Sequence, residues 1–358
     1  MSFVIGLLAF ILMLGVIIMI HEAGHFLAAR AFGVHCHEFS FGMGPALWQK
    51  QGKHTLFSIR AFPIGGYVSM AGETEQEDED PDAWINKVPE NEKLNNKPAW
   101  QQMIIMAAGV IMNFILAIVL TTAIIQVQGR VAEPAAPVVY EVIDNTPAAK
   151  AGLVSGDRIL KVTAEDGSMI EPKTQSQVSE FMQYNHGVST FEILRGDETF
   201  TAKMAPEFDE ESQGWLLGFT AQSQVRKVNF FEAIPEGFKQ VWEDVKMMFR
   251  SIGTLLQGKG LDSLSGPVGI YKVTDQIVSY GFLPYLSLCA LISLNIGIFN
   301  LLPIPALDGG RILILALERI FRRKIPMKIV ESVILASFVL LFGLMIFSTY
   351  NDIVRFFF

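Results

Sequence analysis

A five-residue segment near the N-terminus combines two imidazoles and a carboxylate at a spacing that suits a metal-dependent hydrolase. It reads His21-Glu22-Ala23-Gly24-His25. On a helix, positions i and i+4 share a face, so both imidazoles can bind one Zn²⁺, and Glu22 lies beside them where it can take a proton from water. A pattern with three fixed positions also arises by chance, and two histidines packed on a helix are the alternative.

A zinc enzyme also needs a third protein ligand and an open position, and Asp308 is the candidate. It is the only acidic residue in the long stretch 276–317, and Pro303 and Pro305 interrupt the chain just before it. Broken backbone at membrane depth is tolerated only where it is buried in protein or lines a wet cavity. We therefore expect Asp308 to complete the site; the alternative is a carboxylate that caps a helix over residues 309–320.

The composition is that of a membrane protein. Of the 358 residues, 51% are hydrophobic and only 18% are charged, and the mean hydropathy is +0.36, whereas soluble domains are about 25% charged. These values exclude a disordered chain, a collagen and a disulfide scaffold. The net charge of −8 argues against a nucleic-acid binder, and Cys36 and Cys289 offer neither a metal-binding pair nor a disulfide framework.

Four stretches are apolar and long enough to cross a bilayer, which needs about 20 residues. They are Met1–Ile20, Met103–Val127, Gln276–Leu307 and Ser332–Asn351. No basic residue precedes the first stretch and no small-residue cleavage site follows it, so we expect a span and not a signal peptide. The prolines and asparagines of the third stretch predict that it is not one simple helix. The expected fold class is a polytopic α-helical membrane protein with about four transmembrane helices.

Basic residues indicate the orientation of these spans. The connection between the third and fourth spans is rich in Lys and Arg, which favour the cytoplasmic side of a membrane. These residues are Arg311, Arg319, Arg322, Arg323, Lys324 and Lys328. With four spans, both chain ends and the long segment 128–275 then lie outside, and the candidate metal site lies toward the cytoplasmic side.

Two inserts interrupt the membrane part. Between Ala31 and Trp100 the chain has strand-like runs, such as residues 54–60, with glycines between them. The acidic run Glu73–Asp82 follows, and we interpret it as a solvated loop. The first insert is therefore expected to be a β-rich segment joined to an acidic loop.

The second insert has the pattern of a small α/β domain. The expected elements are strands at Val138–Ile143, Thr190–Leu194 and Thr199–Met204 and a helix around Gln175–Tyr184. The run Pro147-Ala-Ala-Lys-Ala-Gly-Leu153, followed by Gly156-Asp-Arg-Ile159, closely resembles the core of bacterial PDZ domains. Such domains accept an extended chain terminus as an added strand. A generic small α/β insert is the alternative.

Beyond this insert, Asn229–Gln257 has the pattern of an amphipathic helix that lies on the membrane surface or packs on the spans. Gly266–Ile270 is expected to be a turn-rich joint before the third span. The expected domains are an N-terminal membrane half at 1–127, a PDZ domain at 128–208, a linker strand and amphipathic helix at 209–275, and a C-terminal membrane half at 276–358.

The order of these motifs resembles the site-2 protease family of intramembrane zinc metalloproteases. The resemblance rests on the His-Glu motif of the first span, the later Asn300-x-x-Pro303-x-Pro305-x-x-Asp308-Gly motif, and a PDZ-like insert between spans two and three. The chain is most similar to the bacterial regulators of sigma-factor proteolysis, over essentially its whole length. The best-known Gram-negative members carry two tandem PDZ domains, whereas we place only one here.

This resemblance implies a role for each site residue. The implied set is His21, His25 and Asp308 as zinc ligands, Glu22 as general acid/base, and Asn300 and Asn295 as substrate-positioning residues. Either asparagine would hold the unwound substrate backbone or stabilise the oxyanion, and helix–helix hydrogen bonding in lipid is the alternative for both. The Ala31–Tyr67 strands resemble the family's membrane-associated β-hairpin segment, whose edge would hold the substrate extended. Three other histidines, His35, His37 and His54, are interpreted as surface or hairpin polar residues.

The resemblance also implies the reaction and its partners. We expect hydrolysis of peptide bonds within or near transmembrane segments of single-pass membrane proteins, such as anti-sigma factors or remnant signal peptides, in the bacterial cytoplasmic (inner) membrane. An upstream site-1 type protease would act first, and no nucleic acid is involved. A membrane-anchored PDZ scaffold or receptor with a non-catalytic metal site is the rival, but a scaffold has no use for Glu22. A metal transporter is a weaker one, because no pathway is evident.

Overall fold

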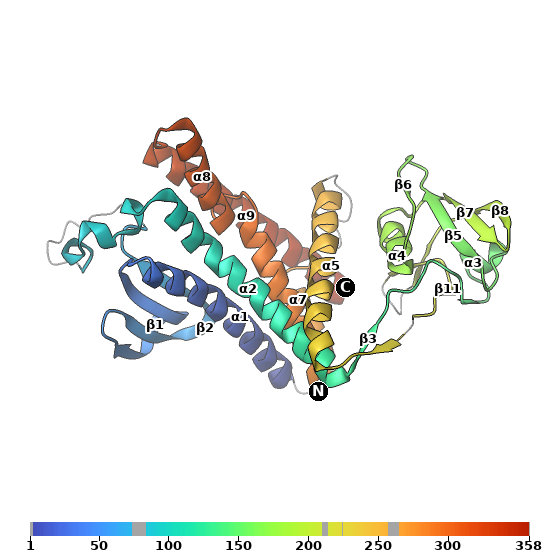
Figure 1. The fold of residues 1–358 in the computed structure, drawn as a ribbon, viewed down its shortest axis with the longest axis horizontal. Coiled ribbons are helices and arrows are strands. Elements are labelled where there is room, and N and C mark those ends of the chain that lie inside the picture. The colour runs from blue at the N-terminus through green and yellow to red at the C-terminus, as the bar shows by residue number, and fades with distance from the viewer. Residues whose placement is uncertain (1–2, 74–83, 210–213, 224, 257–264, 358) are drawn as a thin grey trace. The chain divides into compact units, whose positions relative to one another are not determined.

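The computed structural model describes residues 3–73, 84–209, 214–223, 225–256 and 265–357, which belong to two compact units (Figure 1). The membrane unit comprises Met1–Ile124, Ile234–Arg250 and Asp262–Phe358, and the insert unit comprises Ile125–Ala233 and Ser251–Leu261. The acidic run predicted at Glu73–Asp82 lies, apart from Glu73, outside the described residues.

Four helices of the structure are long and apolar enough to cross a membrane, as the sequence predicted. They are α1 (Phe3–Ala31), α2 (Ala99–Gln128), α7 (Phe282–Leu301) and α9 (Met327–Phe357). A helix suits lipid because all its backbone polar groups are satisfied within the segment. Helix α1 continues past Ile20 to Ala31, so the His-Glu motif is helical and both of its histidines lie on one face.

The third predicted span is broken, as its prolines and asparagines indicated. Helix α6 (Pro267–Ser279) ends before Gly281, whose φ of +116° is a conformation that glycine adopts readily, and α7 begins at Phe282. After α7, residues 302–307 form no helix, and α8 (Asp308–Phe321) starts at the acidic residue. Asp308 therefore sits where an irregular segment turns into a new helix.

The prediction of a turn-rich joint at Gly266–Ile270 is wrong, because α6 begins there. Pro267 occupies the start of the helix, where its missing N–H costs nothing. The Asp352 carboxylate of α9 accepts hydrogen bonds from the backbone N–H groups of Gly266 (2.9 Å) and Gly269 (2.7 Å). A distant side chain thus caps this helix, which the local sequence does not reveal.

Helices α1 and α2 approach each other closely at the His-Glu motif. A Cβ at Gly24 would collide with the carbonyl oxygen of Ala108, so the glycine permits this approach. Buried Ala29, Ile105 and Met106 pack around the contact. Nearer the N-terminus of α1, Met13 packs in a second cluster with Leu288 of α7 and Leu116 of α2. Three helices from distant parts of the chain thereby pack together.

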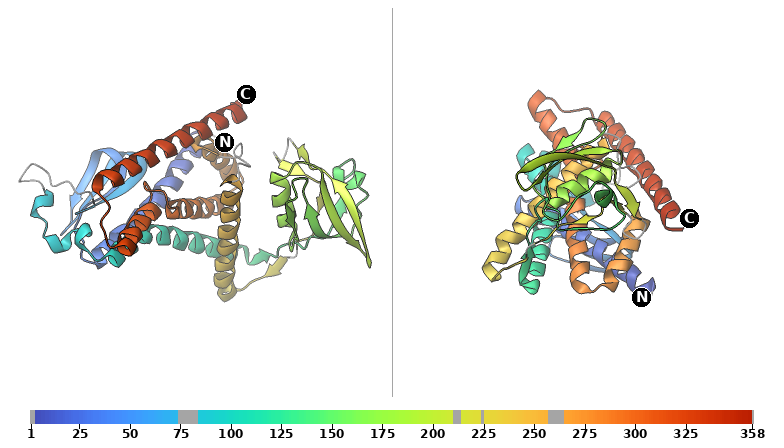
Figure 2. Two further views of the ribbon diagram at one scale, coloured as in Figure 1. Left: turned by 90° about the horizontal axis from the view of Figure 1, so that it is seen from above. Right: turned by 90° about the vertical axis from the view of Figure 1, so that its right-hand side faces the viewer.

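The first insert is a β-hairpin beside α1, as Figures 1 and 2 both show. Strand β1 (Cys36–Gln51) pairs antiparallel with β2 (Leu56–Met70). Both strands bend, so the start of β1 pairs with the beginning and with the end of β2: Phe39 is opposite Phe57 and also Val68. Among the described residues, 66–70 pair only with the start of β1, so this segment is an edge.

Short helices follow the hairpin, and a long amphipathic helix follows the second insert. The short 3₁₀ helices are η1 (Trp84–Lys87), η2 (Glu90–Glu92) and η3 (Leu94–Asn96). The helix expected at Asn229–Gln257 corresponds to α5 (Phe230–Leu256). The Asn229 side chain caps it by accepting hydrogen bonds from the N–H groups of Phe231 and Glu232. Gly237 of α5 faces Thr122 of α2, so α5 packs on a spanning helix.

The insert unit is a small α/β body with its own core. Its helices are α3 (Pro147–Lys150) and α4 (Gln175–Tyr184), and its central sheet has the order β6 (Met169–Ile170), β5 (Arg158–Thr163), β7 (Ser189–Arg195), β8 (Glu198–Met204). The flanking pairs are β3 (Arg130–Ala132) with β12 (Val225–Lys227), β4 (Glu141–Val142) with β11 (Phe219–Thr220), and β9 (Glu207–Asp209) with β10 (Gly214–Leu216). Val178 and Met182 of α4 are buried against Phe191 and Ile193 of β7. The strand expected at Val138–Ile143 is shorter, because only β4 is regular there.

Candidate metal centre and active site

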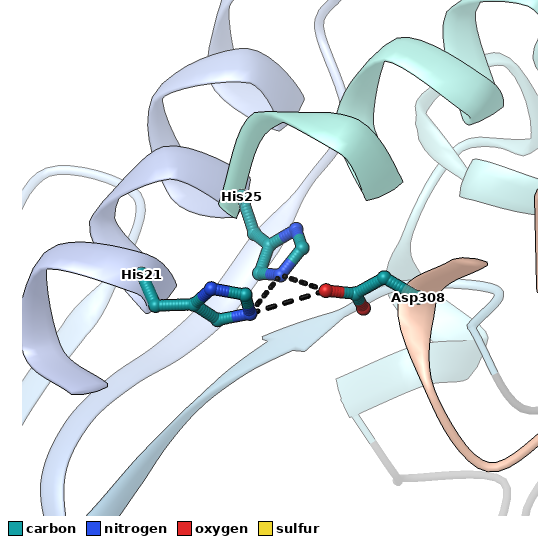
Figure 3. Close-up of side chains that lie close together, drawn as sticks. All are labelled: His21, His25 and Asp308. Carbon is teal, nitrogen blue, oxygen red and sulfur yellow. Dashed lines mark hydrogen bonds and ion pairs between the residues drawn. The ribbon is translucent and has the colours of Figure 1, made fainter. Parts of the chain in front are cut away.

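Two helices bring three potential metal ligands together (Figure 3). The Nε2 atoms of His21 and His25 on α1 are 3.2 Å apart. The Asp308 Oδ2 atom at the start of α8 lies 3.1 Å from the first and 3.4 Å from the second. A tetrahedral zinc ion with bonds of about 2.0–2.1 Å holds its ligand atoms about 3.3 Å apart. The spacing therefore fits one zinc ion.

Helix α2 contacts both imidazoles at their Nδ1 atoms, while their Nε2 atoms lie near Asp308. His25 directs Nδ1 at the backbone carbonyl oxygen of Ile105, 2.8 Å away, so Nδ1 donates and the Nε2 lone pair is free for a metal. His21 directs its Nδ1 at the side-chain amide of Asn113, 3.2 Å away. Both histidines are buried, with exposed fractions of 6% and 7%.

Two features of the surroundings support a cation between these groups. Asp308 Oδ2 is buried, and no described residue gives it an aligned hydrogen bond, although a buried carboxylate is costly without a partner. A Cβ at Gly109 of α2 would lie 2.8 Å from His21 Nε2 and would collide with His25 Nε2. Gly109 thus leaves open the space beside the two nitrogens, and the site fits a metal ion.

The glycines after Asp308 explain how the carboxylate reaches the histidines. A Cβ at Gly309 would collide with the carbonyl of Leu301, and one at Gly310 with that of Ile304. Without side chains, the start of α8 can lie directly on the segment that leaves α7. Helix α8 has no side-chain cap at its N-terminus, so the alternative role of Asp308 as a helix cap finds no support.

The metal-ligand candidates line a cavity of about 1160 Å³, which also receives Glu22 and Asn300. Asn295 is not among its lining residues, because it lies on another face of α7. The hairpin edge contributes Tyr67, Val68, Ser69 and Met70 to the wall. The cavity thus combines a carboxylate beside the metal-binding atoms with an edge strand of the hairpin.

The remaining histidines and cysteines lie elsewhere. The ring of His37 stacks on the ring of Trp84, with centroids 4.1 Å apart. The Nδ1 atom of His35 lies 4.0 Å from Oε2 of Glu92. In the part of the chain that the structure describes, only His21, His25 and Asp308 form a group of three or more potential ligands. Cys36 and Cys289 are buried and free, and burial raises the pKa of the Cys36 thiol to about 12.

Sequence reasoning missed the contribution of α2 to the site. Gly109 and Asn113 were both visible in the second apolar stretch, one helical turn apart. An asparagine in the middle of such a stretch is itself a signal, because polar groups within a membrane are expensive. The role of the Ile105 carbonyl carries no sequence signal, because every residue has one.

Comparison with known proteins identifies the family. The model of peptidase family M50 matches residues 9–344. The chain therefore belongs to peptidase family M50. This family of site-2 proteases is the one that the motifs resembled, and the match extends over nearly the whole chain. The protein is an intramembrane zinc metalloprotease.

Individual M50 relatives agree with this assignment. A Clostridium perfringens protein named as a zinc metalloprotease is 32% identical over 356 residues, which cover 99% of each chain. A Clostridium acetobutylicum protein, also named as a zinc metalloprotease, is 35% identical over 355 residues, which cover 99% of this chain and 97% of that protein. The regulator of sigma-W protease RasP of Bacillus subtilis is 30% identical, covering 99% of this chain and 100% of its own.

Proposed function

We propose that His21, His25 and Asp308 are the zinc ligands of this protease. The observation that supports it is the convergence of their three ligand atoms within 3.4 Å of one another. Bound by these atoms, zinc supplies Lewis-acid chemistry that makes water more acidic and polarises a peptide carbonyl. The three ligand residues line the same cavity as Glu22 and Asn300, so a substrate in that cavity would reach the metal.

Metal analysis of the detergent-purified protein tests the ligand set. We expect about one zinc per chain in the wild type, as in mononuclear zinc proteases, and little or none in His21→Ala and Asp308→Ala. A variant without a hydrogen-bonding role at the site, Ser287→Ala on α7, serves as the control. Zinc that persists in Asp308→Ala would contradict the assignment and favour the rival, a membrane-anchored scaffold with a non-catalytic metal site.

We further propose Glu22 as the general base and acid. It follows His21 on α1 and lines the cavity, and its Cγ is near Gly66 of the hairpin edge. Its carboxylate takes a proton from the attacking water and later gives it to the leaving amine. Glu22→Gln keeps the zinc but should cleave about 10²–10⁴-fold more slowly; loss of zinc instead would make Glu22 a structural residue.

Asn300 and the hairpin edge are proposed to position the substrate. Asn300 lines the cavity on α7, and residues 67–70 line it on β2. An extended peptide can add to a strand edge through main-chain hydrogen bonds, and the Asn300 amide then holds the backbone or the oxyanion. Asn295 is outside the cavity, so its proposed role is limited to packing between helices. Asn300→Ala should slow cleavage more than Asn295→Ala does.

A peptide bond within a helix is shielded and hydrogen-bonded, so the substrate must unwind before hydrolysis. We propose single-pass membrane proteins as substrates, and the name of the Bacillus subtilis relative supports anti-sigma factors; remnant signal peptides offer the same chemistry. A central Gly or Pro lowers the cost of unwinding, so it should speed cleavage of a substrate span. Equal rates with and without the helix breaker would contradict this mechanism.

The insert is proposed to be a PDZ-like domain on the external side of the bacterial cytoplasmic membrane. The support is the run Pro147–Leu153 and the basic residues between α7 and α9, which favour the cytoplasmic side for that connection. In this arrangement an upstream site-1 type protease first shortens the substrate ectodomain. Deletion of residues 135–206 distinguishes two modes: loss of cleavage indicates recruitment of substrates, whereas cleavage of untrimmed substrates indicates exclusion by size, which we favour.

A further inference from the structure

One face of α2 is directed at the two histidines. Ile105, Gly109 and Asn113 follow at intervals of four residues, so they share this face. The Ile105 carbonyl accepts a hydrogen bond from His25 Nδ1. Gly109 has no side chain and so leaves room for both imidazole rings. The Asn113 amide contacts His21 Nδ1. Of these three contacts, only that of Asn113 depends on a polar side chain.

We propose that Asn113 is a positioning residue that fixes the ring and the tautomer of His21 for metal binding. This inference rests on the proposed role of His21 as a zinc ligand. A neutral imidazole that binds metal through Nε2 carries its proton on Nδ1. That proton needs an acceptor, and the terminal amide of Asn113 is 3.2 Å from Nδ1.

The amide can serve either protonation pattern of His21. When the NH₂ group of Asn113 faces Nδ1, the amide donates a hydrogen bond to Nδ1, and the proton of the neutral imidazole is on Nε2. Rotation of the amide by 180° exchanges the nitrogen and the oxygen, so that Oδ1 accepts from Nδ1–H and the Nε2 lone pair is free. An asparagine thereby accommodates the metal-free and the metal-bound histidine without a change of charge.

Asn113 lies fully buried where α2 meets α7, and its amide has an acceptor to spare. It has an exposed fraction of 0%, and the hydroxyl of Ser293 on α7 donates a 2.9 Å hydrogen bond to its backbone carbonyl. Its Cβ lies 3.3 Å from the position that a Cβ on Gly297 would take. Asn113 Oδ1 is buried without a hydrogen-bond partner among the described residues. A spare acceptor oxygen is what the metal-bound tautomer of His21 requires, because rotation of the amide brings that oxygen to Nδ1–H.

The test measures zinc affinity of the purified full chain by competition with a chelator. Asn113→Leu keeps the size of the side chain but cannot accept, and we expect it to weaken zinc binding about 10–100-fold, as loss of an outer-shell partner does. Asn113→Asp restores the acceptor and should bind zinc more tightly than Asn113→Leu. The visible spectrum of the Co²⁺-loaded protein should change in Asn113→Leu and return toward wild type in Asn113→Asp.

A control separates this role from simple packing. Ser293→Ala removes the hydrogen bond to the backbone of the same residue and leaves the amide in place, so it should bind zinc as the wild type does. If Asn113→Leu does not fold, Asn113→Ala gives the same comparison. Wild-type zinc affinity in the acceptor-free variant, or equal weakening in Ser293→Ala, would overturn the proposal.

The outcome for His21 distinguishes this proposal from the ligand assignment on which it rests. If His21→Ala keeps its zinc, the ligand set itself has failed. If His21→Ala loses zinc while Asn113→Leu binds it as the wild type does, the ligand set stands and only the positioning role of Asn113 is wrong.

Discussion

Two aspartates, Asp157 in the insert unit and Asp308 in the membrane unit, have opposite surroundings. In the insert unit, Asp157 has an exposed fraction of 0%. Its oxygens accept from Arg195 Nε at 2.7 Å and Nη2 at 2.8 Å, and from the N–H of Val154 at 2.9 Å. In the membrane unit, Asp308 has only two imidazole nitrogens nearby and no aligned donor for Oδ2 among the described residues.

The difference indicates what each carboxylate is for. A buried charge is tolerated when protein donors satisfy it, as they do around Asp157, and such a group contributes to the fold. Asp308 faces imidazole nitrogens that carry lone pairs, and therefore cannot donate a hydrogen bond, when Nδ1 holds the proton. A cation would be a partner for the carboxylate and for both nitrogens. Stability should therefore depend on Asp157, and metal binding on Asp308.

The largest expected effect comes from Asp308→Asn. This change keeps the shape but removes the charge, so we expect zinc to be lost. Cleavage should then fall by about 10³-fold or more, because a catalytic metal contributes several kcal/mol to the transition state. The melting temperature of the metal-free protein should not fall, since no protein donor depends on this carboxylate. A lower melting temperature of the metal-free variant would mean that Asp308, like Asp157, stabilises the fold.

The next effect concerns the space between the histidines. Gly109→Ala puts a methyl group against both Nε2 atoms, so zinc affinity should drop by at least about tenfold, the size of other changes next to metal ligands. The buried imidazole rings must shift to admit this methyl group, which costs about 1–3 kcal/mol of stability and is partly offset by the higher helix propensity of alanine. Gly343→Ala on α9 is the matched control, since nothing lies within 4 Å of its added methyl group. Unchanged zinc affinity in Gly109→Ala would show that α2 does not limit the site.

These residues also show how far the sequence could be used. The four spans follow from runs of apolar residues, and the break that ends α7 follows from Pro303 and Pro305. His21, Glu22 and His25 are predictable because helical spacing fixes their common face. Asp308 was found by elimination, as the lone acid of an apolar stretch. Local patterns therefore predict what one element contributes.

What the sequence could not reveal depends on contacts between distant elements. The start of α6 was mistaken for a joint because its cap, Asp352, lies more than 80 residues away. Asn113 was overlooked because its partner His21 lies 92 positions earlier in the chain. The bend that pairs the start of β1 with both ends of β2 depends on packing against α1, which local strand propensity does not describe.

A smaller effect is expected in the insert unit from Asp157→Asn. Loss of charge-assisted hydrogen bonds should destabilise this unit by about 1–3 kcal/mol at neutral pH, while zinc content stays at the wild-type level. Hydrogen exchange of β5 and β7 measures this effect. As a control, Glu207→Gln should change little, because Glu207 and its partner Lys150 are 60% and 63% exposed and such pairs contribute about 0–1 kcal/mol.

The difference between wild type and Asp157→Asn should also depend on pH. The hydrogen bonds from Arg195 hold the pKa of Asp157 below its usual value, which is about 3.9 in an unfolded chain. A lowered pKa in the folded state stabilises the protein above the unfolded pKa, and this stabilisation is lost as the pH falls through the folded pKa. The two proteins should therefore converge in hydrogen exchange below about pH 4; a constant difference would contradict the role of the charge.

The smallest effect is expected from Asp352→Asn, which tests whether a carboxylate in the membrane unit can be purely structural. Asp352 is 2% exposed, and its Oδ2 accepts from two N–H groups at the start of α6, so protein donors satisfy it as they satisfy Asp157. Asparagine keeps an acceptor oxygen and loses only the attraction of the charge to the helix N-terminus, about 0.3–1 kcal/mol. Asp352→Ala loses both bonds and should cost about 0.5–2 kcal/mol. The melting temperature should thus fall slightly in the first variant and further in the second, with zinc unchanged in both. Zinc loss in either would mean that the number of protein donors does not separate structural carboxylates from metal-binding ones.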